Sequence, residues 1–259
     1  MQAELKVIGL QGDIRHLDIE SNASYWEAML PQGVDLILLP ETFLTGFATQ
    51  NLKATEPAAG RAETCLVAWA NKVNAWVGGS AFVKVDGRYR NRFFIASPEG
   101  EVHHVDKRHL FGIAGEAEHF DAGSEHVTVT IKGWRIRLAV CYDLRFPVWL
   151  RNDHRNPYDA LVLVANWPEK RRDAWTTLLR ARAMENQAYV MGVNRIGEDG
   201  FGIPHAGDSR AFGPLGEILD EAPSHAPHVM TATWEAIRIK AVRKNFPFLA
   251  DQDDFELKL

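Results

Sequence analysis

The feature that most constrains the fold is a set of short, almost continuous apolar runs. The clearest is residues 34–41, VDLILLPE, which has the composition of a central strand buried on both faces. Residues 134–143 and 159–168 carry similar runs and are also predicted to be strands. Between such runs lie segments with helical spacing of apolar residues, and these predict helices at 22–30, 62–74, 174–188 and 234–246.

Further strands are predicted along the rest of the chain, at 5–12 and 189–197. Residues 75–100 contain a DG turn signal and residues 207–219 contain GPLG, so each is predicted to form two strands joined by a turn. We find no Pro/Ser-rich linker, internal repeat or low-complexity stretch. The pattern therefore predicts an α/β protein in which residues 1–259 form a single domain of helices layered on sheets.

Composition excludes several classes of function. The net charge is −5 and the charged residues are interspersed, which argues against a nucleic-acid partner. No stretch reaches the ~20 apolar residues of a membrane span, and the first residues, MQAELKVIGLQGD, do not resemble a signal peptide. Two cysteines are too few for a disulfide framework. We therefore expect a reduced, cytoplasmic protein with no membrane partner.

Three chemically capable side chains follow predicted strands: Glu41, Lys107 and Cys141. Because active sites gather at the carboxyl ends of strands in open α/β sheets, these side chains are candidates for one site. Together they would suit covalent catalysis on an amide or nitrile without a metal or cofactor. Glu41 would take the thiol proton of Cys141, and Lys107 would stabilise charge on a carbonyl oxygen.

Each of these residues also has a purely structural interpretation. A buried cysteine is most often a small apolar residue, and Cys65, on the apolar face of a predicted helix, is interpreted as core. Glu41 alone could be a helix N-terminal acid or a satisfied strand-end carboxylate. Lys107 alone could belong to a solvated cluster with its charged neighbours, and on spacing alone Cys141 could equally be core.

The motifs around these residues resemble those of the nitrilase superfamily of carbon–nitrogen hydrolases. LILLPETFLTGF is similar to the glutamate motif of that family, VDKRHLF to its lysine motif and VCYDLRFPVW to its cysteine motif, in the same order. VANWP, LLRARAMENQAYVMGVNRIG and GDSRAFGPLGEIL resemble later segments of the family. The resemblance covers almost the whole chain.

This resemblance implies a four-layer α-β-β-α sandwich. It also implies that Glu41 is the general base, Lys107 the oxyanion stabiliser and Cys141 the nucleophile, with the backbone N–H of Tyr142 as a second oxyanion donor. Family members carry another glutamate between the lysine and the cysteine. Glu116 and Glu118 are both candidates, and spacing favours Glu116.

Within the superfamily, YDLRFPVW, VANWP and RARAMENQAYV most resemble the omega-amidase branch. That branch implies hydrolysis of the terminal amide of small dicarboxylic acid monoamides such as 2-oxoglutaramate and 2-oxosuccinamate. Arg145 is the candidate for binding the substrate carboxylate, because guanidinium binds carboxylate in a bidentate manner; the alternative is a structural pair with Asp143 or another acid. The residues expected to wall an apolar slot are Phe43, Phe111, Tyr142 and Trp167.

Other activities remain open on sequence alone. The protein could be another amidase of this superfamily, acting on deaminated glutathione or an N-carbamoyl amide, or an inactive binding module on the same fold. His103, His104 and His109 have no metal-ligand spacing, and Arg182 is expected to pair with Glu185 on a helix. The resemblance implies a homodimer or larger homo-oligomer, to which the C-terminal FLADQDDFELKL could contribute.

Overall fold

Two six-stranded sheets form the centre of the computed structural model, which describes residues 1–257. The first sheet has the order β14 (His228–Glu235), β1 (Glu4–Gln11), β2 (Leu36–Leu38), β3 (Trp76–Val85), β4 (Arg88–Ala96), β5 (Val102–Asp106). The second has the order β13 (Ile218–Glu221), β12 (Arg210–Phe212), β9 (Tyr189–Asn194), β8 (Ala160–Ala165), β7 (Trp134–Val140), β6 (Thr128–Ile131). A two-stranded ribbon pairs β10 (Ile196–Glu198) with β11 (Pro204–Ala206).

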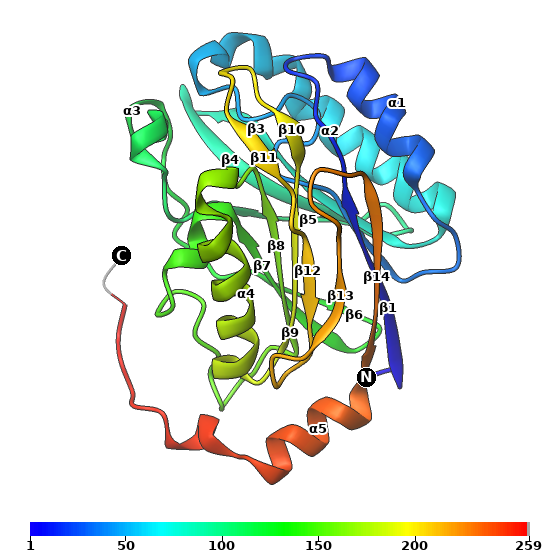
Figure 1. The fold of residues 1–259 in the computed structure, drawn as a ribbon, viewed down its shortest axis with the longest axis vertical. Coiled ribbons are helices and arrows are strands. Elements are labelled where there is room, and N and C mark those ends of the chain that lie inside the picture. Colours follow the sequence, from blue (N-terminus) through cyan, green and yellow to red (C-terminus); the bar gives the residue numbers. More distant parts are fainter. Residues whose placement is uncertain (258–259) are drawn as a thin grey trace.

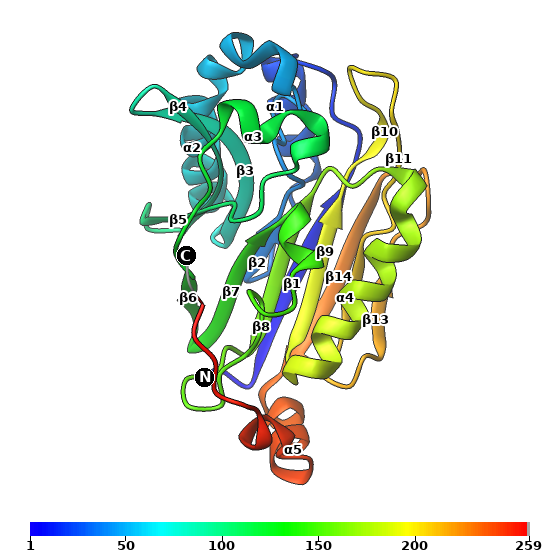
Figure 2. The ribbon, with the colours of Figure 1, turned by 90° about the vertical axis from the view of Figure 1, so that its left-hand side faces the viewer.

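Helices cover the outer faces of the paired sheets (Figure 1). Helices α1 (Ile19–Met29) and α2 (Leu52–Val73) pack on the first sheet, and α4 (Arg172–Asn186) packs on the second. Figure 2 shows α4 on one side of the sheets and α2 on the other. The expected four-layer α-β-β-α sandwich, built as a single domain, is confirmed.

The remaining helices are short or lie at the end of the molecule. Helix α3 (Glu116–His119) follows β5, and α5 (Ala236–Asn245) lies beside the N-terminus (Figures 1 and 2). Short 3₁₀ helices occupy Thr49–Asn51, Gly112–Ala114, Cys141–Arg145, Glu169–Arg171 and Phe248–Asp251. Within residues 1–257, no helix is both long and apolar enough to cross a membrane.

The apolar run of the second predicted strand is buried on both faces, as its composition indicates. Leu36 and Leu38 belong to the core between the sheets, whereas Ile37 and Leu39 pack toward α1 and α2. Successive side chains of a strand point to opposite faces, so a strand at the centre of a layered sandwich has to be apolar throughout. The regular strand is shorter than predicted, because Pro40 has no backbone N–H and begins the loop that carries Glu41.

Several element boundaries differ from the sequence prediction. Helix α2 begins ten residues earlier than expected, at Leu52, and includes Pro57. The strand predicted at 134–143 ends at Val140, and the C-terminal helix begins at Ala236 because the residues before it form β14. The two predicted hairpins are confirmed. Of the C-terminal FLADQDDFELKL, the last two residues lie outside the described part of the chain.

Candidate active site

Four loops that follow β2, β5, β7 and β8 meet at one edge of the sandwich. They carry Glu41, Lys107, Cys141 and Asn166 respectively. In the second sheet β7 and β8 run parallel, so their carboxyl ends reach the same edge. This edge is where the fold brings together side chains that are far apart in sequence.

Cys141 occupies a strained turn at the end of β7. Its φ is +44°, in the left-handed region that non-glycine residues seldom adopt. The turn is fixed by Asp143, whose carboxylate accepts hydrogen bonds from the backbone N–H groups of Val140 (3.1 Å) and His109 (2.9 Å). Asp143 therefore connects the cysteine turn to the loop that carries Lys107.

Lys107 is fully buried in a cluster with two glutamates. Its Nζ lies 2.8 and 3.0 Å from the carboxylate oxygens of Glu116 and 3.4 Å from Oε1 of Glu41. Burial disfavours the ammonium form, but the charges of Glu116, Glu41 and Cys141 outweigh this effect and raise the pKa of Lys107. Lys107 is therefore a fixed cation at neutral pH.

Glu41 is held by two amide groups that the sequence analysis did not identify. The Asn91 side chain donates to Glu41 Oε1 (2.7 Å), and the Asn166 backbone N–H donates to Oε2 (2.7 Å). The Asn166 side chain also donates to the Glu41 carbonyl oxygen and to Thr42 Oγ1. Because these bonds fix both carboxylate oxygens, Glu41 has a single orientation within the cluster.

The environment of Cys141 favours the protonated thiol. Burial raises its pKa well above the usual value, the negative charge of Glu41 raises it further, and Lys107 opposes this only in part. A reaction at this sulfur therefore needs a base to remove the thiol proton during attack, and the nearby Glu41 carboxylate is the candidate for that base.

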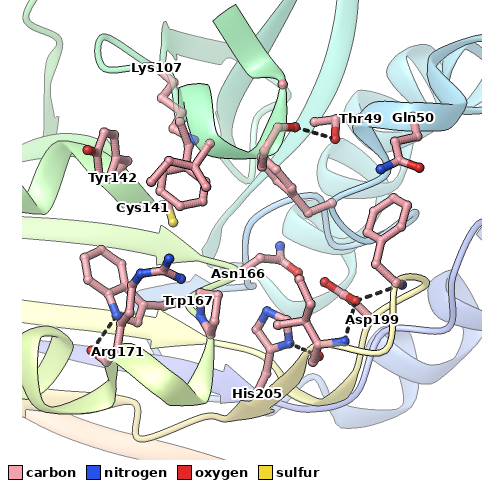
Figure 3. Close-up of a pocket in the computed structure, with 18 of the residues that line it drawn as sticks. Thr49, Gln50, Lys107, Cys141, Tyr142, Asn166, Trp167, Arg171, Asp199 and His205 are labelled. Carbon is pink, nitrogen blue, oxygen red and sulfur yellow. Dashed lines mark hydrogen bonds between the residues drawn. The ribbon is translucent and has the colours of Figure 1, made fainter.

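Cys141 and Lys107 reach a pocket of about 490 Å³ (Figure 3). Its walls are mainly aromatic and apolar, with a few polar groups, as is usual for a small-molecule site. Residues from distant parts of the chain line it, among them Phe47, Phe111, Tyr142, Arg145, Asn166, Trp167, Arg171, Asp199 and His205.

Most of the residues predicted for the slot line this pocket. Phe111, Tyr142 and Trp167 do so, and the Phe111 and Tyr142 rings are in edge contact. Arg145, the candidate for binding the substrate carboxylate, also lines the pocket, with its guanidinium 4.8 Å from the Trp167 ring centre. The alternative interpretation, a structural pair of Arg145 with Asp143, is not found among the described residues, where Asp143 pairs with His109.

The prediction that Phe43 lines the slot is wrong. Phe43 is completely buried on the other face of the first sheet, where its ring packs against Trp69 of α2. The loop after Glu41 turns back toward the pocket only further along the chain, so that Phe47 provides its aromatic ring, 5.2 Å below the Lys107 ammonium.

The two candidate glutamates have different positions. Glu116 is buried against Lys107, and its carboxylate also accepts the Phe111 backbone N–H, whereas the side chain of Glu118 is 76% exposed at the pocket mouth. Cys65, in α2, is buried in the core that α1 and α2 form with the first sheet. The predicted pair of Arg182 with Glu185 is confirmed at 2.9 Å, and Arg182 also donates to the Leu144 carbonyl behind the cysteine turn.

His205 adds a neutral imidazole to the pocket wall. Burial, together with the charge of Arg195, lowers the pKa of His205 to about 4. No group of three or more His, Cys, Asp or Glu side chains suited to a metal ion occurs in the part of the chain that the structure describes.

A family model described as carbon–nitrogen hydrolase matches residues 8–244. The chain belongs to the carbon–nitrogen hydrolase family. Its members hydrolyse carbon–nitrogen bonds, and the predicted membership of the nitrilase superfamily, closest to the omega-amidase branch, is confirmed.

Individual relatives of this carbon–nitrogen hydrolase cover most of its length. Omega-amidase YafV from Escherichia coli K12 is 42% identical over 98% of both chains. The 2-oxoglutaramate amidase from Bacillus subtilis is 32% identical over 84% of both chains. The crystal structure of XC1258 from Xanthomonas campestris, a CN-hydrolase superfamily protein with an arsenic adduct in its active site, superposes with a TM-score of 0.95 at 38% identity, covering 99% of this chain and 100% of that one.

Proposed function

We propose that this carbon–nitrogen hydrolase is a cysteine-dependent amidase that removes ammonia from the terminal amide of small dicarboxylic acid monoamides, including 2-oxoglutaramate and 2-oxosuccinamate. The activities named for the Escherichia coli and Bacillus subtilis relatives support the amide substrate. The observation that carries the proposal is the position of Cys141. It lines the pocket on a strained turn, beside the buried cluster of Lys107, Glu41 and Glu116.

The first half of the proposed reaction forms a thioester. Cys141 Sγ attacks the amide carbonyl carbon while its proton passes to the Glu41 carboxylate. The negative charge that develops on the carbonyl oxygen is stabilised by the Lys107 ammonium and the Tyr142 backbone N–H. When the tetrahedral intermediate collapses, the C–N bond breaks and the proton held by Glu41 passes to the nitrogen, which leaves as ammonia.

The second half restores the thiol. Glu41, again ionised, takes a proton from a water molecule, whose oxygen attacks the thioester carbonyl. The C–S bond then breaks, the acid is released, and the sulfur takes back the proton from Glu41. Glu116 acts as a positioning residue, because it holds the Lys107 ammonium at a fixed place through both halves.

The far end of the proposed substrate is a carboxylate, for which Arg145 is the proposed partner. Arg145 lines the pocket, is stacked on Trp167 and has no ion pair with any residue in 1–257. A guanidinium held over an aromatic ring keeps its hydrogen-bonding edge free for a carboxylate.

A panel of amides tests this function. We expect ammonia release from 2-oxoglutaramate and 2-oxosuccinamate at rates well above those from deaminated glutathione, N-carbamoyl amino acids and simple nitriles. Cys141→Ala removes the nucleophile, so activity should fall at least ~10⁴-fold while the circular dichroism spectrum stays unchanged. If Cys141→Ala retained activity, or the wild type released ammonia from none of these compounds, the proposal would be rejected.

We also propose a homodimer in the cytoplasm. Both cysteines are free thiols, which suits a reducing compartment. Exposed apolar side chains near the C-terminus, at Phe246, Phe248 and Phe255, offer surface for a second copy. Light scattering on the purified protein should give twice the mass of one chain, and the mass of one chain would contradict the dimer.

A further inference from the structure

Two arginines of the pocket have no acidic partner. Arg145 and Arg171 come from different loops, are both half-buried, and lie over aromatic rings rather than against carboxylates. The Arg171 guanidinium is 5.4 Å from the centre of the Phe111 ring, and Arg145 lies over Trp167. Among residues 1–257, neither side chain forms an ion pair, so both charges are left for a ligand.

Other arginines of the second half of the chain do form ion pairs with acidic side chains. Arg172, the next residue along the chain, pairs with Asp208 at 2.8 Å, Arg182 pairs with Glu185, and Arg195 pairs with Asp13 at 2.7 Å. Bringing two uncompensated cations into one pocket costs free energy through partial burial and mutual repulsion. A bound anion would remove that cost, so the unpaired state of these two side chains points to a ligand with negative charge.

Arg171 is also held in place by its backbone. It ends the 3₁₀ helix Glu169–Arg171, and its carbonyl oxygen accepts a hydrogen bond from the Trp167 indole N–H at 2.8 Å. The Trp167 backbone N–H is itself bound to Asn194 Oδ1. In Figure 3 Arg171 lies beside Trp167 in the wall of the pocket. The backbone of Arg171, which carries the guanidinium, is therefore held in a fixed position in the pocket wall.

The two acidic residues of the pocket are engaged elsewhere or lie at its mouth. Asp199 accepts the backbone N–H groups of Phe201 and Ile203 through Oδ1, which closes its own loop. Glu118 is largely exposed. These carboxylates therefore do not neutralise the two arginines of the pocket.

We propose that Arg171 is a specificity-determining residue that recognises the 2-oxo group of the substrate. The inference rests on the proposed function, in which Arg145 binds the carboxylate. One guanidinium satisfies a carboxylate through two parallel hydrogen bonds. A second guanidinium on another part of the wall then fits a second acceptor beside the carboxylate, and in a 2-oxo acid that acceptor is the ketone oxygen.

A pair of substrates that differ only in the 2-oxo group tests this role. For Arg171→Gln, kcat/KM should fall by about 100-fold on 2-oxoglutaramate and by less than about 5-fold on glutaramate, as expected for a lost hydrogen bond from a charged donor. The control is Lys170→Gln, which removes the same charge from an exposed neighbour outside the pocket and should change both values by less than about 2-fold. Equal losses on both substrates, or no loss, would overturn the proposal.

A binding measurement separates this inference from the proposed function. Titration calorimetry on the wild type should show tighter binding of 2-oxoglutarate than of glutarate by about 10-fold or more, and Arg171→Gln should abolish the difference. If the wild type bound both diacids equally, the role of Arg171 would be rejected even with full amidase activity. If the wild type hydrolysed neither 2-oxoglutaramate nor glutaramate, the proposed function would be rejected. Tighter binding of 2-oxoglutarate than of glutarate, lost in Arg171→Gln, would still support recognition of the 2-oxo group by Arg171.

Discussion

At the residue scale, the buried charges of the site are arranged by neutral side chains. Asn91 donates to Glu41 and lies 3.5 Å from Glu116, and so bridges the two carboxylates that flank Lys107. The amides therefore hold the Glu41 carboxylate in a fixed orientation beside Lys107.

Arg145→Leu tests whether Arg145 binds the substrate carboxylate. The substitution removes the guanidinium but keeps an apolar side chain of moderate size on Trp167. KM for glutaramate should rise by about 10- to 100-fold, because a charged hydrogen-bonding partner of the substrate carboxylate is lost. KM for butyramide, which has no carboxylate, should rise by less than about 3-fold. Equal changes in both KM values would exclude binding of the carboxylate by Arg145.

His205 gives the fold a defined response to acid. Its pKa is lowered to about 4 in the folded protein and is about 6.5 in an unfolded chain, so the unfolded state binds more protons between these values. The free energy of unfolding should therefore decrease as the pH falls from 6.5 to 4, by up to ~3 kcal/mol from this residue.

Chemical denaturation at pH 7 and pH 4.5 measures this contribution. His205→Gln should lose less stability than the wild type on acidification, whereas His225→Gln, at an exposed histidine, should follow the wild type. An identical loss in His205→Gln and the wild type would show that His205 does not remain neutral in the folded state.

At the scale of elements, strand β14 shows where the sequence prediction failed. Its residues alternate between buried and exposed, with Met230, Ala232 and Trp234 facing inward, which is a clear strand pattern. The helical spacing that begins at Trp234 led to a predicted helix over 234–246 instead. Residues 228–235 form a strand because they pair along their whole length with β1. In this strand the Trp234 ring stacks on the Tyr189 ring between the sheets.

The cysteine turn could not be predicted from local sequence. The apolar run before Cys141 continues naturally as a strand through Tyr142, and nothing in CYDLR favours a positive φ. The turn exists because Asp143, His109 and Arg182, from three separate segments, fix its backbone. Strained geometry at a functional site depends on such long-range contacts.

Two glycines in different elements should respond in opposite ways to alanine. Gly60 lies inside α2 with open space around it, so Gly60→Ala should stabilise the protein by about 0.5–1 kcal/mol. Gly192 in β9 faces α4, and a methyl group there would lie 2.6 Å from Leu179 and 2.8 Å from Trp175, so Gly192→Ala should destabilise it by ~1–3 kcal/mol. Urea denaturation measures both; a stabilising Gly192→Ala would contradict the tight packing of α4 on β9.

At the scale of the whole molecule, the layered fold and the family were predictable because they depend on patterns that run along the chain. The apolar strands indicated a layered α/β fold, and the polar residues after them indicated a site with Glu41, Lys107 and Cys141. The four-layer sandwich was implied by the resemblance of the motifs to the nitrilase superfamily. Asn91 and Arg171 were not predictable, since no motif marks them. The pairing of β4 with β5 places Asn91 beside Lys107. Arg171 lines the same pocket only because the folded chain places its loop there.

The central claim is that Cys141 becomes covalently acylated during amide hydrolysis. Acid quenching during turnover of 2-oxoglutaramate, followed by mass spectrometry of the intact protein and its peptides, tests it most directly. We predict an adduct with the mass of the substrate less ammonia, located on the peptide that contains Cys141 and absent from Cys141→Ala. Rapid turnover with no adduct on Cys141, or an adduct on another residue, would contradict the account.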